Sequence, residues 1–171
     1  MIRSSMQPIL PLADPESYRQ AMRHWVAGVT IVTSLYQGYR HGMTVSSFTS
    51  ISLIPPMILI SLDRAARTAR LISASRIFAV TILDASQQEI SERFAGKISE
   101  EQDRFMGLET ETIITGAPLI KGGLAYLDCR VAFTRRAGTS TVYFAEVLAA
   151  KSVPEGAPLV YSNRSYFKLQ K

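Results

Sequence analysis

Hydroxyl side chains are concentrated in one short segment of the chain. Six of nine consecutive residues carry a hydroxyl and are interleaved with apolar residues such as Val45: they are Thr44, Ser46, Ser47, Thr49, Ser50 and Ser52. An exposed polar face of a strand explains only part of this density. Hydroxyls and strand-end N–H groups hydrogen-bond to phosphate oxygens or to the edge of a heteroaromatic ring. The segment therefore predicts a binding site for a ligand with such groups.

A second polar segment follows a strongly apolar run. It consists of Ser61, Leu62, Asp63, Arg64, Ala65, Ala66, Arg67 and Thr68. We expect a buried strand to enter a turn here, with Thr68 capping the helix that follows. Arginines beside a helix N-terminus form a good anion site, although a polar turn with a capped helix explains the segment equally well by itself. Taken together, the two segments favour a ligand that carries a phosphate.

Several other kinds of site are excluded by composition and motif. The chain has neither a G-x-G-x-x-G nor a G-x-x-x-x-G-K-[ST] phosphate loop, and it lacks the G-x-S-x-G elbow of a common hydrolase class. Cys129 is the only cysteine, and His24 and His41 are the only histidines. With one cysteine, no intrachain disulfide can form. These few cysteine and histidine residues also lack the spacing of zinc ligands, so we expect no metal site.

Charge and hydropathy describe one soluble domain. The chain has 171 residues, 47% of them hydrophobic, and a formal net charge of +5. Its basic residues are spread along the chain without interleaved aromatics, which argues against nucleic acid as a partner. The longest apolar stretch, Ile51 to Leu62, is split by prolines and too short for a bilayer, and Met1 to Pro15 has no signal-type apolar run. We therefore expect a cytoplasmic protein with no membrane partner.

The N-terminal region predicts an arm followed by a helix. Residues 1–14 read as a flexible arm, and 15–171 as a single domain. Asp14 is placed to cap the helix, with Pro15 at its first position. The apolar side chains that follow share one helical face, and Gly28 is the expected end. They are Tyr18, Met22, Trp25 and Val26.

Beyond Gly28 the pattern is that of short strands joined by turns. Expected strands cover 29–33, 43–50, 57–62, 77–83, 124–134 and 141–150, with shorter pieces at 158–161 and 166–169. Short helices are expected at 68–75 and from Asp84 to about Phe94. Most connections are too short for crossover helices. The expected fold is therefore mainly β with short helices, an antiparallel barrel.

The order and spacing of several motifs carry a family resemblance. They are Tyr18–Met22, Gly28–Thr33, His41–Pro56, Leu62–Arg64, Phe78–Val80 and Arg93–Gly96. In these motifs the chain resembles the short-chain flavin reductases, the reductase components of two-component flavin monooxygenases. The resemblance implies an FMN-binding split β-barrel, a homodimer with flavin near the subunit interface. It also implies reduction of FMN or FAD by NADH or NADPH, with the reduced flavin passed to a partner oxygenase.

The resemblance also implies site residues. Thr44, Val45, Ser46 and Ser47 would contact the isoalloxazine ring and ribityl chain, Ser61 to Arg67 would hold the phosphate, and Phe94, Ala95 and Gly96 would border the flavin. Hydride transfer from a nicotinamide to a flavin depends mainly on positioning, and the flavin carries the difficult chemistry. We therefore expect no catalytic acid or base.

One motif departs from the family. The family's Gly-Asp-His-Thr-like run near the C-terminal strands places a histidine beside the nicotinamide. The matching residues here, with Tyr161 as a further candidate nicotinamide contact, are Gly138, Thr139, Ser140 and Thr141. Losing the acid and the imidazole is expected to weaken or alter donor binding. Two readings stay open: an NAD(P)H-dependent flavin reductase, and a split-barrel flavoprotein that lacks nicotinamide-driven turnover or uses another electron donor.

Overall fold

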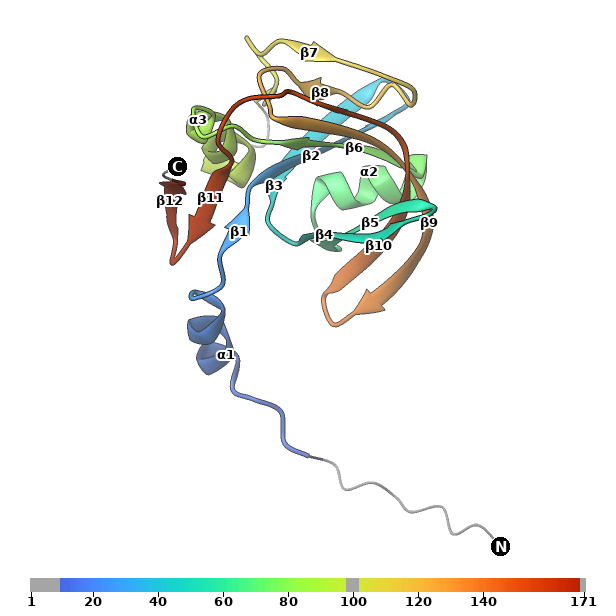
Figure 1. Cartoon of the computed structure of the whole chain (residues 1–171). Helices are drawn as coiled ribbons and strands as arrows, with labels where there is room; N and C mark the ends of the chain where they lie inside the picture. The colour runs from blue at the N-terminus through green and yellow to red at the C-terminus, as the bar shows by residue number, and fades with distance from the viewer. Residues whose placement is uncertain (1–9, 98–101, 170–171) are drawn as a thin grey trace, which may run out of the picture.

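The computed structural model describes residues 10–97 and 102–169 (Figure 1). Residues 10–14 have no regular secondary structure, and the rest of the expected N-terminal arm lies outside the described residues. Within the described ranges, no helix has the length and apolar character that crossing a lipid bilayer requires.

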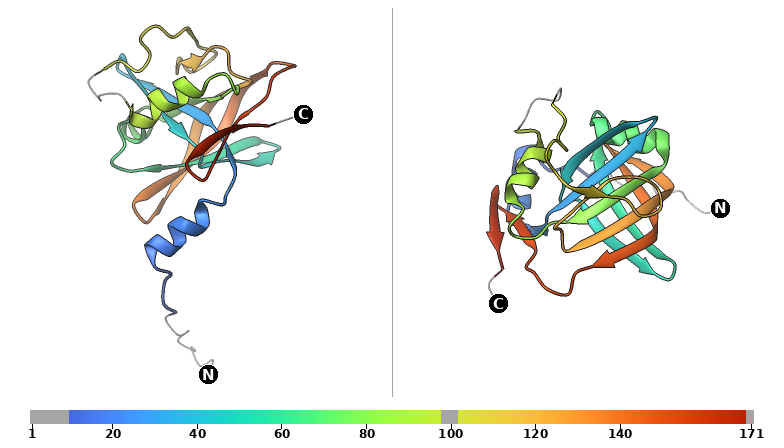
Figure 2. Two further views of the ribbon diagram at one scale, coloured as in Figure 1. Left: turned by 90° about the vertical axis from the view of Figure 1, so that its left-hand side faces the viewer. Right: turned by 90° about the horizontal axis from the view of Figure 1, so that it is seen from above.

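A curled antiparallel sheet forms the body of the molecule. In the described part of the chain it has seven strands in the order β3-β2-β6-β9-β10-β5-β4. Their bounds are β2 Thr30–Tyr36, β3 Tyr39–Val45, β4 Phe48–Leu53, β5 Pro56–Asp63, β6 Ile77–Ile82, β9 Ala125–Ala137 and β10 Ser140–Ser152. The sheet rolls up into the barrel seen from above in Figure 2. The expected antiparallel split barrel is confirmed.

The sheet curls because its apolar residues face one interior. Along β5, burial alternates so that Ile58, Ile60 and Leu62 point inward. They meet Val32 of β2 and Tyr143 of β10 in the main core. A strand with one buried face has a defined register, because a one-residue slip would expose the whole set.

The two edge strands, β3 and β4, are consecutive in sequence. Ser46 and Ser47 join them, although the strands lie at opposite ends of the sheet order. The expected continuous strand over 43–50 was therefore wrong: its residues end β3 and begin β4. Hydrogen bonds across the break go to β5, because Ser61 N donates to Ser47 O at 3.1 Å.

Other strand boundaries also differ from expectation. The strand expected from residue 43 starts earlier, at Tyr39, because the turn before it takes up only Gln37 and Gly38, which both have positive φ. Likewise, β9 and β10 extend almost to each other, so the hairpin turns at Gly138 and Thr139. Ladder pairing extends each strand beyond the segment of highest β-propensity.

A smaller sheet lies beside the barrel. It pairs β1 (Ala27–Gly28) with β11 (Leu159–Ser162), and β11 with β12 (Ser165–Lys168). Val29 N donates to Leu159 O at 3.0 Å, which ties this sheet to the start of β2. A separate ribbon of β7 (Thr110–Glu111) and β8 (Leu119–Ile120) was not expected, because two-residue strands leave no periodic pattern.

Helix α1 (Pro15–Met22) projects from the barrel, as Figure 1 shows. Its start is as expected, since the Asp14 carboxylate accepts a hydrogen bond from Ser17 N at 2.9 Å. It ends at Met22, six residues before the expected Gly28. The reason is tertiary, because Ala27 and Gly28 pair with β11 as a strand. Every residue of α1 is exposed.

Helix α2 (Arg67–Ser75) packs on β2 and β3 and places Ala69 and Ile72 in the main core. The expected capping role of Thr68 was wrong. The N-cap is Ala66, whose methyl group accepts no hydrogen bond, and Thr68 is buried within the first turn. The expected helix from Asp84 is shorter, α3 (Gln88–Glu92), and continues as a π-helical turn, η1 (Arg93–Lys97).

Candidate functional site

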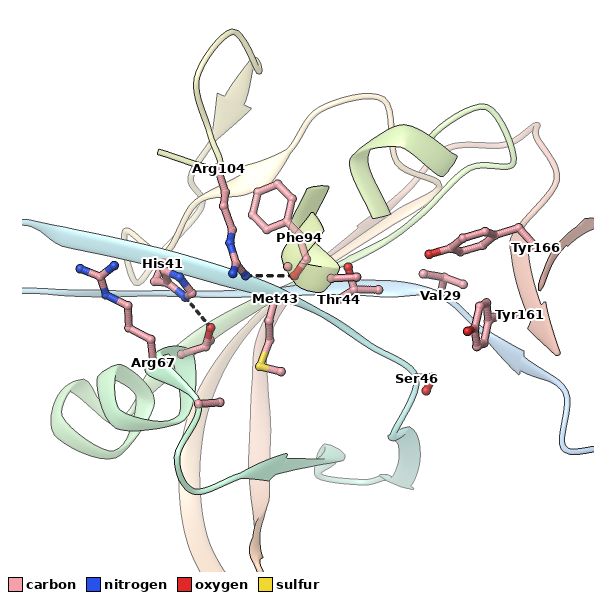
Figure 3. Close-up of a pocket in the computed structure, with 14 residues that line it drawn as sticks. Val29, His41, Met43, Thr44, Ser46, Arg67, Phe94, Arg104, Tyr161 and Tyr166 are labelled. Atoms are coloured by element: carbon pink, nitrogen blue, oxygen red, sulfur yellow. Dashed lines mark hydrogen bonds between the residues drawn. The ribbon is translucent and has the colours of Figure 1, made fainter. Parts of the chain in front are cut away.

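A cavity of about 420 Å³ lies where β3, the start of α2, η1 and the small sheet meet (Figure 3). Its described lining residues are Val29, His41, Met43, Thr44, Ser46, Ala66, Arg67, Thr68, Phe94, Ala95, Gly96, Arg104, Tyr161 and Tyr166. The volume falls within the range of about 300–1,000 Å³ that is usual for small-molecule sites. Strand β3 runs along the site from His41 toward Ser46 and so connects two ends of different chemistry.

One end of the cavity is cationic. His41 and Arg104 lie there with Arg67, on the same side of Met43 in Figure 3. His41 is 8% exposed, and its Nδ1 lies 2.8 Å from Thr68 Oγ1. The first turn of α2 also begins at this end, and helix N-termini favour anions. This end is therefore suited to a phosphate.

Arg104 is buried although it carries a full charge. It is 7% exposed, and its Nη1 donates to Gly42 O at 3.1 Å and to Phe94 O at 3.0 Å. These carbonyls anchor the guanidinium between β3 and η1. Arg104 thus contributes a positively charged group to this wall of the cavity.

The opposite end of the cavity is aromatic. Tyr161 of β11 and Tyr166 of β12 lie beside Val29, with ring centroids 5.0 Å apart. The hydroxyls of Tyr166 and Ser91 lie 2.9 Å apart. Aromatic faces with fixed polar edges suit a flat heteroaromatic ring.

The strand between the two ends presents polar atoms with defined roles. Thr44 Oγ1 donates to Ser91 O at 2.6 Å, so toward a ligand this hydroxyl can only accept. Ser46 lies two residues further along the chain, directly after the end of β3. The two side chains can therefore bind the edge of a ring or the hydroxyls of a sugar-like chain.

The wall opposite β3 is formed by η1. Phe94, Ala95 and Gly96 line the cavity there, and Gly96 has φ of 91°. Phe94 packs so closely on Gly42 that a Cβ at Gly42 would lie 2.8 Å from the ring. Gly96 has backbone angles outside the helical region, so the chain kinks at this wall of the cavity.

Many of the residues expected at the site line this cavity. They are Thr44, Ser46, Ala66, Arg67, Thr68, Phe94, Ala95, Gly96 and Tyr161. Val45 and Leu62 are buried in the main core, so their backbone atoms alone could contact a ligand. Ser50 and Ser52 lie on the edge strand β4, away from the lining.

Ser47 and Ser61 line a neighbouring cavity of about 420 Å³ that also includes Ser46 and Trp25. Ser47 Oγ donates to Ser61 O at 2.5 Å. The hydroxyl of Ser47 thus ties the connection between β3 and β4 to β5, which gives it a structural role.

The turn after β5 contacts the hairpin between β9 and β10, and its Asp63 and Arg64 do not line the cavity. Asp63 Oδ1 accepts from Ala65 N at 2.7 Å, and Arg64 Nε donates to Thr139 O at 3.2 Å. Ser140 pairs with Asp63, so the run Gly138 to Thr141 forms a hairpin tip against this turn. In the described lining of the cavity, Tyr161 is present and Gly138 to Thr141 are not.

Sequence reasoning missed several residues of the lining. They are Val29, His41, Met43, Arg104 and Tyr166. Period-two alternation along β3 offered a signal for His41 and Met43, which lie on one face of the strand. No local pattern marks Arg104, since its place depends on a contact with residues far away in the sequence.

The donor set fits a ligand that carries a phosphate. Among residues 10–97 and 102–169, no three His, Cys, Asp or Glu side chains are grouped to hold a metal ion. A cationic end, a polar strand and an aromatic end, in that order, match a ligand with a phosphate, a hydroxylated chain and a planar ring.

Comparison with known proteins agrees with this chemistry. A model of the flavin reductase-like domain matches residues 22–170. The reductase subunit HsaB of a flavin-dependent monooxygenase from Mycobacterium tuberculosis is 32% identical over 155 residues, covering 90% of this chain and 81% of HsaB. The FMN reductase (NADH) RutF of Variovorax paradoxus is 34% identical over 166 residues, covering 97% and 90%.

A solved structure has the same fold. The NADH:FAD oxidoreductase SgcE6 of Streptomyces globisporus, in complex with NAD and FAD fragments, superposes with a TM-score of 0.85. The two are 30% identical, and the match covers 94% of this chain and 98% of that one.

Proposed function

Because the chain belongs to the flavin reductase-like domain family, we propose that it is an NADH-dependent flavin reductase. It reduces FMN or FAD and supplies the reduced flavin to a partner monooxygenase. The names of its relatives support this, since one is the reductase subunit of a flavin-dependent monooxygenase and another an FMN reductase that uses NADH.

The observation that carries the proposal is the polarity of the cavity. Arg67, Arg104 and the start of α2 would hold the phosphate at one end. Thr44 and Ser46 would bind along the ribityl chain and the ring edge, and Tyr161 with Tyr166 would border the ring. This orientation follows from charge, because the cationic residues lie at the end away from the tyrosines.

The bound flavin supplies the redox chemistry by accepting a hydride from NADH. The protein's part is to position the ring and to keep one face of it accessible to the donor. Phe94 and Met43 exclude water from the walls of the cavity. We assign no side chain as an acid or base, because hydride transfer itself moves no separate proton.

Steady-state oxidation of NADH tests the proposal. With added FMN or FAD, the purified protein is expected to oxidise NADH, and without flavin it is expected to show little turnover. NADPH in the same assay tests donor choice. Binding of FMN without turnover with either donor would sink the reductase function and leave a flavoprotein driven by another donor.

That second function is motivated by the hairpin tip. Gly138 to Thr141 lack the acid and imidazole of the family's motif, and Ser140 pairs with Asp63 instead of lining the cavity. Replacing Ser140 with histidine separates the two functions. A sharp rise in turnover for Ser140→His would mean that the native chain is impaired toward nicotinamide.

A homodimer is part of the proposal. Helix α1 and the segment after it expose apolar side chains, including Trp25 at 68% and Val26 at 57%. The neighbouring cavity between Trp25 and Phe48 of β4 is also largely apolar in its lining. A second copy that covers this surface would bury it close to Ser46, which belongs to both cavities.

We place the protein in the cytoplasm. Its one cysteine, Cys129, is a buried free thiol, which suits a reducing compartment.

A further inference from the structure

Ser91 of α3 is a buried polar residue that contacts the candidate site from behind. It has no exposed surface and lies outside the described lining of the cavity, yet two residues of that lining bind to it. The Ser91 carbonyl accepts the hydrogen bond from Thr44 Oγ1 at 2.6 Å, and the Ser91 hydroxyl lies 2.9 Å from the hydroxyl of Tyr166. One residue thus connects the polar strand of the cavity with its aromatic end.

The segment that carries Ser91 is well anchored. Ser91 N donates to Gln87 O at 3.1 Å. The Gln87 side chain is held at both of its polar atoms, because Oε1 accepts from Asp84 N at 3.1 Å and Nε2 donates to Lys121 O at 2.9 Å. Three residues after Ser91, Phe94 is 1% exposed and belongs to a core cluster. These contacts fix the position of Ser91 and do not involve β12.

Tyr166 stands on a less secure element. β12 is four residues long and lies at the edge of the small sheet, where it pairs with β11. Its residues Ser165 and Phe167 are exposed, whereas Tyr166 is partly buried with its ring against Tyr161. A short hairpin is only marginally stable by itself. The contact with Ser91 therefore helps to fix the Tyr166 ring at the aromatic end of the cavity.

From this arrangement we propose that Ser91 is a positioning residue for the flavin and that it acts through Tyr166. Its carbonyl binds β3 and its hydroxyl binds Tyr166, so the two groups together set the spacing between the polar strand and the aromatic end, where the planar ring is received. Without the Ser91 hydroxyl, Tyr166 takes several positions, and flavin binding has to select one of them, which lowers the affinity. The inference rests on the proposed function, because it takes the ring to lie at the aromatic end.

Ser91→Ala tests this role, and Tyr166→Phe removes the same hydrogen bond from the other side. Each variant is expected to weaken the binding of riboflavin and of FMN by the same factor, about two- to tenfold, which corresponds to the net contribution of one hydrogen bond. The phosphate makes no difference, because the change is at the ring end. The double variant is expected to bind like either single variant, since both remove one shared interaction. Flavin fluorescence measures the dissociation constants.

Ser34→Ala is the matched control. Ser34 of β2 is also fully buried, and its hydroxyl donates to Ile77 O at 2.9 Å, outside the described lining of the cavity. Urea unfolding is expected to show a comparable loss of stability in the two alanine variants. Only Ser91→Ala is expected to weaken flavin binding. At saturating FMN it is also expected to lose fine structure in the visible absorption band of the bound flavin, because a loosely held ring meets more water.

Each other outcome overturns a stated part. Native affinity in Ser91→Ala, additive losses in the double variant, or an equal loss in Ser34→Ala overturns the positioning role and leaves the reductase function standing. If Ser91→Ala is too unstable to assay, Tyr166→Phe decides: an equal loss for both flavins supports the role, and native affinity overturns it. A native protein that binds neither flavin overturns the proposed function itself.

Discussion

Single residues divide the candidate site into parts with different tasks. Arg67 and Arg64 are only three positions apart, yet Arg67 lines the cavity and Arg64 is held by Thr139 O at the hairpin tip. From the sequence alone, both arginines were predicted to bind the phosphate. Their different surroundings now predict different effects on binding.

Arg67→Ala is expected to weaken the binding of FMN by about 1–2 kcal/mol, or about five- to thirtyfold in the dissociation constant. The reason is the loss of a charge-assisted hydrogen bond at an exposed position. Riboflavin, which has no phosphate, is expected to change little. Titration of Trp25 fluorescence with each ligand measures both affinities. Arg64→Ala is the matched control and is expected to leave the FMN affinity near the native value. Equal losses for FMN and riboflavin in Arg67→Ala contradict the placement of the phosphate.

Gly42 is a second residue whose role is set by one contact. A Cβ there would lie 2.8 Å from Phe94 Cε1 and 3.0 Å from Thr33 Cγ2. Gly42→Ala is expected to destabilise the protein by about 1–3 kcal/mol through overpacking, and to weaken flavin binding because Phe94 lines the cavity. Urea unfolding measures the loss. Gly28→Ala, with open space around its Cβ, serves as control, and a comparable loss there would mean that Phe94 is not the cause.

Among the elements, β9 lies in the middle of the sheet between β6 and β10. It carries Cys129, which pairs with Phe78 and has no exposed surface. Burial, together with the neighbouring Asp128 carboxylate, raises the pKa of the Cys129 thiol. Because the pKa is raised, the thiol stays protonated in the folded protein at any pH below that value, and a protonated thiol is a poor nucleophile.

The thiol is therefore expected to react only when the sheet opens. At pH 8 a thiol-specific reagent should label the native protein much more slowly than the protein in concentrated urea, where the single cysteine reacts fully. Bound FMN should slow the native reaction further, since a ligand that binds the folded state lowers the population of open states. Rapid stoichiometric labelling of the native protein would show that β9 is not protected in solution.

At the scale of the whole molecule, the apolar side chains of helix α1 and of the segment after it are exposed to solvent. Helix α1 stands away from the barrel, and all its residues are exposed (Figures 1 and 2). An amphipathic helix in water gains most of its stability from packing its apolar face. In the proposed homodimer, a second copy of the chain covers the apolar face of α1.

Val26→Asp is expected to convert the dimer to a monomer, because it places a charge within an apolar contact surface. Light scattering coupled to size exclusion measures the mass. Ile114→Asp changes a residue of similar exposure, 59%, outside this surface, and is expected to leave the mass at the dimer value. A native protein that runs as a monomer at micromolar concentration would rule out the homodimer.

Local chemistry predicted much of the fold. β-Branched runs such as Thr30 to Thr33 specified strands, and Asp14 with Pro15 specified the start of α1, because these preferences act within a few residues. The end of α1, the break at Ser46 and Ser47 and the burial of Thr68 were not predictable in this way. Each depends on a partner elsewhere in the chain: β11, β5 and His41.

The candidate site divides along the same line. The sequence by itself determined that hydroxyls and arginines follow two strands, which was enough to indicate a phosphate-bearing ligand. The order and spacing of its motifs carried the resemblance to the flavin reductases. The tertiary structure decided which of them meet: Arg67 lines the cavity, Arg64 does not, and His41, Arg104 and Tyr166 join from distant segments. The physical reason is that side-chain type is a local property, whereas the direction of a side chain depends on strand pairing and on where the curled sheet brings its edges.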